Sequence, residues 1–477
     1  MTWHRRFFWT LLVFLPTQIG MHFWPDWAHV LGRRVDYLSP TVYLTDILIG
    51  LVIFFWFLES FFRISNQESR IRVGEKQKIF SMIRDSRFLI LLVVMNVLVA
   101  KNGFAATYKW MKVGEFIALG WYIVKTRPAL SMVITPLSIS VLYSSLLAIA
   151  QFILQRSVGG PLWWLGERTF DVSTLGIARF DFDVSLFPFH LPAGKSGFSF
   201  FGLRPYATFP HPNVLGGFLA ALLPGIIQFS NNPITQLSNK KIYYYLTVFL
   251  GTVALFLTFS RSAIVVGIVG IALAIARIKK HELQMLGIGI FVLILASYSM
   301  LHNSTDESVV VRMALNDAAI RLWKTEPIFG VGLGNYLVRL PEVLATRTIY
   351  FLQPAHNIYL LLLSEIGFVG VGLLAIWVAV RVNYELRIMK YGERKTKSII
   401  HTSLFIILIL GLVDHYPATL QQGQLLLTIL IAMGYNSVHD LDAMERPLKY
   451  RRAGDRKTGW VRNNVPGEHT PRTRVWR

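Results

Sequence analysis

The sequence contains no cysteine among its 477 residues, which excludes disulfide bonds, thiolate metal sites and a cysteine nucleophile. Charged side chains are also scarce, at 16% of the chain, whereas hydrophobic residues make up 53%. A soluble domain rarely combines so few charges with a mean hydropathy of +0.47. Acidic residues are the scarcer charges, since 27 Asp and Glu stand against 48 Lys and Arg. No nucleic-acid-binding motif accompanies this basic excess, so we expect no nucleic acid partner.

The hydrophobic residues are gathered in long blocks, such as "IYYYLTVFLGTVALFLTF" (242–259) and "SAIVVGIVGIALAIA" (262–276). Blocks of this kind predict membrane-spanning helices. The expected fold is therefore an all-α, polytopic integral membrane protein with about 12 transmembrane helices and two long external segments. The predicted spans are 7–24, 41–62, 88–101, 105–124, 129–153, 213–230, 242–259, 262–276, 284–301, 358–380, 398–418 and 422–438.

The basic residues between the spans predict the orientation of the chain. The N-terminus "MTWHRRFFWTLLVFL" lacks an evident cleavage site, so we expect a retained first span. Most Lys and Arg residues of the loops fall on one side, which the positive-inside rule assigns to the cytoplasm together with both termini. A transmembrane domain (1–439) then carries external segments 154–212 and 302–357. The basic tail 440–477 is expected to be disordered, either bound to lipid head groups or solvated.

Within the external segment 302–357, the stretch 308–327 repeats apolar residues at helical spacing, which predicts an amphipathic helix near the membrane surface. The segment 154–212 is rich in aromatic residues, Gly and Pro, and predicts a packed wall. In the fourth predicted span, Lys109, Lys112 and Glu115 are costly in hydrocarbon and should face protein or a polar cavity.

The stretch "PAHNIYLLLLSEIGFVG" (354–370) places His356 and Asn357 directly before a span. A helix starting here would bring Gly367 and Gly370 to nearly one face, where a neighbouring helix could approach closely. The pair could simply cap the helix, because Asn accepts hydrogen bonds from free amides at helix starts. It could instead supply a reactive imidazole at the external end of the span.

Other candidate residues lie at predicted external ends. Arg261, in "TFSRSA", could bind phosphate oxygens through paired hydrogen bonds, or snorkel to lipid head groups. Arg204 and His211 precede the span at 213, where Gly216 and Gly217 permit close packing. His211 could also be part of a structural turn. The glycines of "PIFGVGLGNY" (327–336) predict a turn and not a nucleotide loop, since no Lys-Ser/Thr follows. The external acids show no metal-ligand spacing with His, so no metal is expected.

The sequence resembles the O-antigen ligase and polymerase family of bacterial membrane glycan-transfer proteins. The resemblance extends over roughly 200–370. It rests on the motifs "RPYATFPHPNVLGG", "TFSRSA", "VRMALNDAAIRLW", "PIFGVGLGNY" and "HNIYLLLLSEIGFVG", in this order on about 12 predicted spans.

The resemblance implies a membrane glycosyltransferase C-like architecture and a glycan donor carried on polyprenyl (undecaprenyl) pyrophosphate, with no cofactor. The acceptor is a glycan or glycolipid, as in lipopolysaccharide or other cell-envelope polysaccharide synthesis. His356 would be the general base, supported by Asn357 and His211. Arg261 and Arg312, with Arg204 and Arg321 as further candidates, would bind the pyrophosphate.

These motifs do not separate a ligase from a polymerase. A transporter or flippase is the alternative of another class, suggested by the many spans and by the charges at 109–115. The implied location is the cytoplasmic (inner) membrane with the site on the external, periplasmic face.

Overall fold

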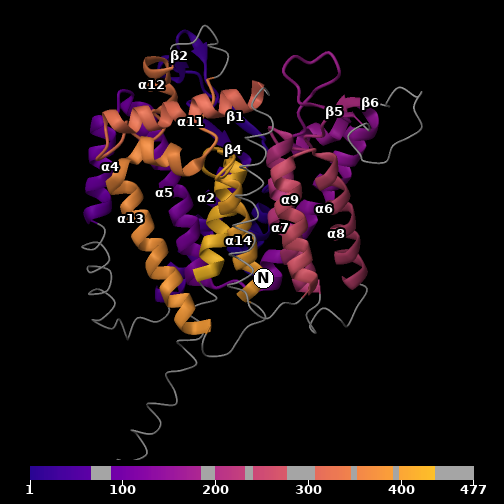
Figure 1. Ribbon diagram of the computed structural model, residues 1–477. Helices are drawn as coiled ribbons and strands as arrows, with labels where there is room; N and C mark the ends of the chain where they lie inside the picture. Colours follow the sequence, from indigo (N-terminus) through magenta and orange to yellow (C-terminus); the bar gives the residue numbers. More distant parts are fainter. Residues whose placement is uncertain are drawn as a thin grey trace, which may run out of the picture.

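The computed structural model describes residues 1–65, 87–183, 199–230, 240–276, 307–344, 352–389 and 397–435. Within them the protein is mostly helical (Figure 1). Roughly parallel helices form a bundle, and a layer of short strands and one crossing helix lies over one of its ends (Figure 1). The N-terminus lies at the opposite end. The predicted span 284–301 and tail 440–477 lie outside the described residues.

The helices are α1 (Trp3–Val13), α2 (Leu44–Ser65), α4 (Arg87–Val99), α5 (Gly103–Thr126), α6 (Leu130–Leu154), α7 (Pro212–Ser230), α8 (Lys240–Leu257), α9 (Arg261–Ala276), α11 (Glu307–Thr325), α12 (Tyr336–Val343), α13 (Ile358–Met389), α14 (Lys397–Leu410) and α15 (Tyr416–Thr419). A further helix covers 421–435. Short 3-10 helices are η1 (Asp26–Ala28) and η2 (Gly160–Leu165).

Among the described residues, six short strands form three antiparallel pairs, which the sequence did not predict. They are β1 (Gly20–His22) with β4 (Thr41–Tyr43), β2 (His29–Val30) with β3 (Arg33–Arg34), and β5 (Arg179–Asp183) with β6 (Ser199–Leu203). All three pairs lie at the end of the bundle that α11 crosses (Figure 1).

The helical class is confirmed, whereas the predicted number of spans is not. Four described helices are long and apolar enough to cross a bilayer, and four more are apolar but shorter. The long segments are Leu44–Phe62, Leu130–Leu154, Pro212–Ser230 and Ile358–Ile376. A hydrocarbon core of ~30 Å needs about 20 helical residues, so the shorter helices do not establish spans by length alone.

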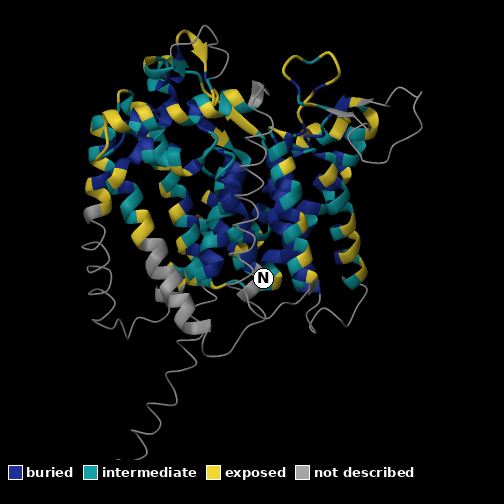
Figure 2. Cartoon of the chain, in the orientation of Figure 1, coloured by how far each residue is buried: buried dark blue, intermediate teal, exposed yellow. Residues whose placement is uncertain are grey.

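The centre of the bundle is α7, which packs against α8, α9 and α14. Figure 2 shows buried residues concentrated in the middle of the bundle. Gly216 and Gly217 make these contacts possible. A β-carbon on Gly216 would lie 3.0 Å from Ala263, and one on Gly217 would overlap the hydroxyl of Tyr416. The predicted close packing at this glycine pair is confirmed.

The predicted first span, 7–24, is wrong as a continuous helix. Helix α1 ends at Val13, and the chain reaches β1 at Gly20 after a turn. Polar groups in this turn bind other segments, since Thr17 donates to the Leu165 carbonyl (2.8 Å) and Gln18 to the Thr208 carbonyl (2.6 Å). Pro16 lacks the N–H that a continuing helix would use.

The interpretation of Gly367 as part of a helix-packing face is also wrong. Gly367 breaks α13, with φ 63° and ψ −171°. The glycine turn at 330–334 packs against the backbone at this break. Val331 donates to the Ser364 carbonyl (2.8 Å) and Phe368 to the Pro327 carbonyl (2.9 Å). Gly370 faces Ile366 of its own helix and not a neighbouring one. The two glycine motifs therefore form one backbone joint, at which the predicted turn is confirmed.

Replacing Gly367 by Ala should destabilise the protein. The backbone conformation is one that residues other than glycine rarely adopt, at a cost of about 1–3 kcal/mol. In addition, the new methyl would overlap the Ile328 carbonyl. The matched control is Gly372→Ala in the same helix, where nothing lies within 4 Å of the added carbon. Thermal unfolding in detergent should show a lower midpoint for Gly367→Ala alone. Equal midpoints for the two variants would rule out this account of the joint.

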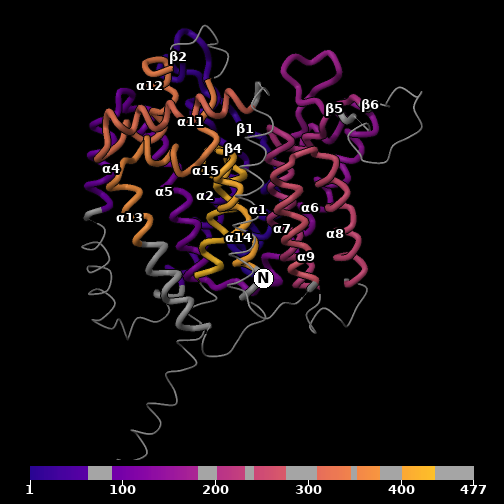
Figure 3. Tube along the Cα trace, viewed as in Figure 1, coloured from indigo at the N-terminus to yellow at the C-terminus, as the bar shows by residue number. Residues whose placement is uncertain are grey.

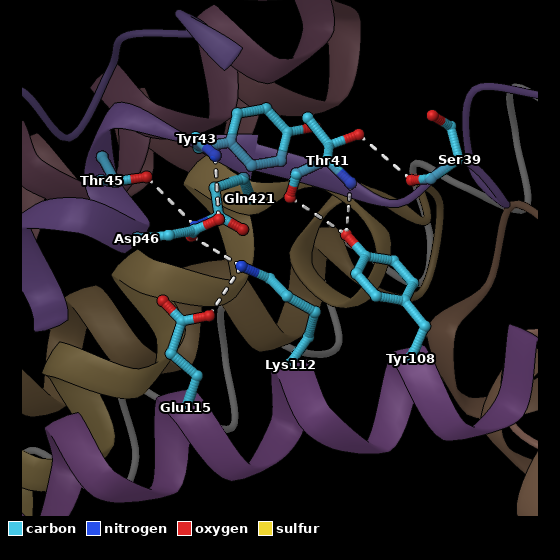
Figure 4. Close-up of polar contacts among 9 residues, drawn as sticks. All are labelled: Ser39, Thr41, Tyr43, Thr45, Asp46, Tyr108, Lys112, Glu115 and Gln421. Atoms are coloured by element: carbon cyan, nitrogen blue, oxygen red, sulfur yellow. Dashed lines mark hydrogen bonds and ion pairs between the residues drawn. The ribbon is translucent and has the colours of Figure 1, made fainter. Parts of the chain in front are cut away.

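The charged residues of α5 lie against protein, as predicted. Lys112 donates to Asp46 (2.6 Å) and Glu115 (2.8 Å) (Figure 4). Gln421 donates to the same Asp46 carboxylate and to Thr45 (3.1 Å). This network ties α2, α5 and the helix 421–435 together just below β4. Its charges pair with one another, as buried charges require.

Candidate functional site

A cluster of polar side chains is formed by Arg204, His211, Arg261, Arg312, His356, Asp414 and His415. The first of these residues in the sequence, Arg204, follows β6. Its Nε donates to the Thr258 carbonyl (2.6 Å), and Nη2 donates to Oδ1 of Asn213 at the start of α7 (2.6 Å). Burial lowers the pKa of Arg204 to about 10, to which the charges of Arg312 and Arg261 contribute. The guanidinium remains charged at neutral pH and is held in a fixed orientation.

Arg261 begins α9 and is exposed at the turn after α8. This turn is held by Phe259, whose φ of 49° is uncommon for a residue other than glycine. The ring of Phe259 stacks on Phe180 of β5 at 4.2 Å. The stack ties the strand pair β5–β6 to the turn and brings Arg261 to the same end of the bundle as Arg204.

The third arginine of the cluster, Arg312, is half-buried on α11. This helix crosses the end of the bundle, as Figure 1 shows, and its Leu315 and Leu322 are buried. The predicted helix is confirmed. The charge of Arg312 acts on Arg204, His211, His356 and Asp414. Arg312 therefore lies near both the arginines and the histidines.

Arg321 is not brought to this cluster. It is exposed on α11 and forms an ion pair with Asp317 (2.7 Å), whose side chain is also exposed. We therefore give Arg321 no role at the site.

Asn357 caps α13, and His356 lies directly before it. The Asn357 Oδ1 accepts from the amides of Tyr359 (2.9 Å) and Leu360 (3.1 Å). The capping interpretation is thus right for Asn357. His356, in contrast, has a buried Nδ1 without a hydrogen-bond partner among the described residues. The cap fixes the position of the backbone at His356, directly before the helix, but the imidazole takes no part in it.

Two residues of the cluster, Asp414 and His415, were missed by the sequence interpretation. The predicted span 398–418 is too long, because α14 ends at Leu410 and the chain turns. The Ile358 amide donates to the Gly411 carbonyl (2.8 Å), which joins this turn to the start of α13. Adjacent Asp and His between two apolar blocks are costly in hydrocarbon and were a signal available in the sequence.

The His415 ring meets His356 edge to face, with ring centroids 5.0 Å apart. Its Nδ1 lies 2.7 Å from the Thr419 hydroxyl in the short helix α15, which Figure 3 labels. The Oδ1 of Asp414 accepts a hydrogen bond from the backbone amide of His415 (2.8 Å). Its Oδ2 lies 3.4 Å from the side-chain nitrogen of Asn213. The turn therefore connects His356 to the Arg204–Asn213 pair.

The charges explain which protonation states the cluster favours. Burial lowers the pKa of His356 to about 3, with His415, Arg312 and His211 lowering it and Asp414 opposing them. Burial also lowers the pKa of His415, and the surrounding protein together with the charge of Arg204 lowers the pKa of His211. For Asp414 burial raises the pKa, but the positive charge around it, which includes Arg312, outweighs burial and the net pKa is lowered. At neutral pH the histidines are neutral and Asp414 is ionised.

His211 precedes α7, and its Nδ1 accepts from the Asn213 amide (3.1 Å). This bond supports the structural interpretation of the turn. The side chain is nevertheless exposed and its ring meets Tyr206 at 6.1 Å. His356 and Asp414 are half-buried, so the cluster is open to solvent. Among the described residues, no three His, Asp or Glu side chains are arranged to hold a metal ion.

The buried neutral histidines predict a loss of stability in acid. An unfolded histidine titrates near 6.5, whereas the folded His356 and His415 titrate lower. As the pH falls below 6.5, the unfolded chain takes up protons first, and stability decreases by up to about 1.4 kcal/mol per pH unit for each histidine. Above 6.5 this contribution is constant. The thermal midpoint should fall between pH 7 and pH 5, and less steeply in His356→Gln. If the thermal midpoint depended on pH equally in wild type and His356→Gln, the lowered pKa of His356 would be contradicted.

The fold is thus a bundle of apolar helices that carries three arginines, neutral histidines and one carboxylate at one end. Residues 246–375 match the family model for O-antigen ligase. Over this segment the protein is therefore similar to the O-antigen ligase family. The matched segment contains Arg261, Arg312 and His356, whereas Arg204 and Asp414 lie outside it. No curated protein matches the chain.

Proposed function

We propose that this protein transfers a glycan from a polyprenyl-pyrophosphate carrier to a sugar hydroxyl of a glycan or glycolipid acceptor. The match of residues 246–375 to the O-antigen ligase family model supports glycan transfer of this type in an integral membrane protein. The observation that carries the finer proposal is that Arg312 lies near both a neutral His356 and Arg204, which in turn lies near Arg261. A diphosphate complements the arginine charges, and the reaction needs no nucleotide, because the pyrophosphate is already an activated leaving group.

The arginines bind the pyrophosphate oxygens through charge-assisted hydrogen bonds. As the bond between the anomeric carbon and the pyrophosphate oxygen breaks, negative charge grows on the leaving group. Fixed guanidinium groups stabilise this charge without reorganising. Arg204 is the best fixed of the three, since a carbonyl and a side-chain amide oxygen both accept from it.

His356 takes the proton of the acceptor hydroxyl while the hydroxyl oxygen attacks the anomeric carbon. A pKa of about 3 makes the imidazole neutral but weakly basic. Binding the anionic pyrophosphate offsets the arginine charges and raises this pKa. The base thus gains strength only when the donor is bound. The resulting imidazolium is stabilised by the negative charge of Asp414.

We further propose that the site faces outward, on the external face of the cytoplasmic (inner) membrane, with both termini in the cytoplasm. The basic loops support this orientation through the positive-inside rule. Helix α11, which carries Arg312, and the N-terminus lie at opposite ends of the bundle (Figure 1). The polyprenyl tail then lies among the helices, with its pyrophosphate at the interface. The segments 154–212 and 302–357 are external in this orientation.

The alternative reactions lead to different products. A polymerase uses the growing polysaccharide as the acceptor, and a transporter forms no new bond. The paired charges of Lys112 do not favour transport, because they join three helices and do not line an open path. The test uses sealed proteoliposomes that contain a fluorescent polyprenyl-pyrophosphate glycan, with glycolipid or polysaccharide acceptors and no nucleotide. We expect the label on an acceptor. Label that crosses the bilayer still attached to its carrier would support the transporter instead.

A further inference from the structure

The N-terminal strand segment (residues 20–43) also reaches the cluster. It contains β1 to β4 and contributes Tyr37, whose ring meets His415 edge to face with centroids 5.5 Å apart. Since His415 packs in the same way against His356, the three rings form a continuous series. Tyr37 is half-buried, so part of it remains accessible to a ligand.

The packing of this segment holds Tyr37 in place. Val35 and Leu38 flank it in the sequence and are buried in one cluster with Leu315 of α11 and Leu337 of α12. Ser39 donates to the Phe23 carbonyl (2.7 Å) across the segment. The Asp46–Lys112 network fixes the end of β4, as Figure 4 shows.

The charges around Tyr37 differ from those around the arginines. Burial raises the pKa of Tyr37, and the negative charges of Asp414 and Asp36 raise it further. The charges that act on Arg204 include those of Arg261 and Arg312. The series of rings therefore runs from His356, on which the charge of Arg312 acts, through His415 to Tyr37, on which the carboxylates of Asp414 and Asp36 act.

We propose that Tyr37 positions the acceptor sugar, and that this sugar is uncharged. The inference rests on the proposed function. If the arginines hold the pyrophosphate, the base must lie between the donor and the incoming hydroxyl, and the acceptor enters from the flank of Tyr37. A sugar ring packs the C–H groups of one face against an aromatic ring, and the tyrosine hydroxyl can hydrogen-bond its polar edge. Asp36 and Asp414 disfavour an acidic sugar at this position through repulsion of like charges.

The test measures transfer by wild type, Tyr37→Ala and Tyr37→Phe, with methyl glucoside and methyl glucuronide as acceptor probes. Tyr37→Ala should raise the acceptor KM about tenfold while the donor KM stays within about twofold. Tyr37→Phe should raise it less, by about threefold, because only the hydroxyl is lost. The wild type should prefer the glucoside. Tyr245→Ala on α8 is the matched control, since this tyrosine is 45% exposed outside the cluster, and it should change neither KM.

The outcomes separate this inference from the proposed function. A wild type that releases no polyprenyl pyrophosphate with any acceptor, including glycolipid extract, contradicts the function itself. An active wild type whose acceptor KM is unaffected by Tyr37→Ala contradicts the acceptor role. The same holds if both KM values change together, as a structural role predicts. Transfer to the glucuronide alone, or to neither probe, contradicts the uncharged acceptor.

Discussion

Replacing His356 by Gln should lower the rate of glycan transfer by about 10³-fold. A positioned general base contributes typically 10²–10⁴-fold, and glutamine cannot accept the acceptor proton. Gln nearly preserves the volume and polarity of the side chain, and the Asn357 cap does not involve the imidazole. The variant should therefore fold. Initial rates of transfer at saturating donor and acceptor give the comparison, with thermal unfolding as a check of the fold.

The matched control is His29→Gln, at a half-buried histidine in the N-terminal strand segment that lies 3.1 Å from the Pro25 carbonyl. It should retain nearly full activity. A His356→Gln protein within tenfold of wild type would remove His356 from the mechanism as a base.

Replacing Arg312 by Ala should lower kcat/KM for the donor by about 10²–10³-fold. Loss of one fixed donor to a developing negative charge typically has an effect of this size. Arg312→Lys should recover part of the rate, because lysine keeps the charge but lacks the paired geometry of the guanidinium. The acceptor KM should change little in either variant. Steady-state kinetics with each substrate varied in turn would give these values.

Arg321→Ala is the control on the same helix. Its guanidinium pairs with Asp317 at the surface, and such exposed pairs contribute about 0–1 kcal/mol to stability. We expect near wild-type rates from this variant. If Arg321→Ala impaired donor use as strongly as Arg312→Ala, the assignment of only one face of α11 to the site would be wrong.

Much of the bundle could be predicted from the sequence because apolar blocks and helices coincide. The predicted spans 129–153 and 213–230 differ from α6 and α7 by at most one residue at either end. The break in α13 could not be predicted in this way. It depends on the glycine turn at 330–334, which is distant in the sequence and hydrogen-bonds into the break at Gly367.

The site was predictable in part for a similar reason. His356, Arg261, Arg312 and Arg204 were marked by motifs, and the structure brings these four together. Helical geometry separates Arg312 from Arg321, because nine residues at about 100° each place them on opposite faces of α11. Asp414 and His415 were hidden inside an apolar run, where the end of α14 is fixed by contacts with α13.

The N-terminal strand segment could not be predicted because of its hydrophobic surroundings in the sequence. Its first residues follow the apolar stretch of α1, which led to one long predicted span. The contacts that end the helix, from Thr17 and Gln18, reach residues more than a hundred positions away. No local feature of the sequence therefore indicates that Tyr37 lies beside His415, which belongs to the turn after α14.

The most direct test of glycan transfer is to count both products of one reaction. Purified protein is incubated with polyprenyl-pyrophosphate glycan and acceptor in the absence of nucleotide. Released polyprenyl pyrophosphate and new glycosidic bonds on the acceptor are then measured together. We predict one bond for each carrier released, with both products lost in His356→Gln. Carrier release without a new bond, or equal yields from wild type and His356→Gln, would contradict the proposed reaction.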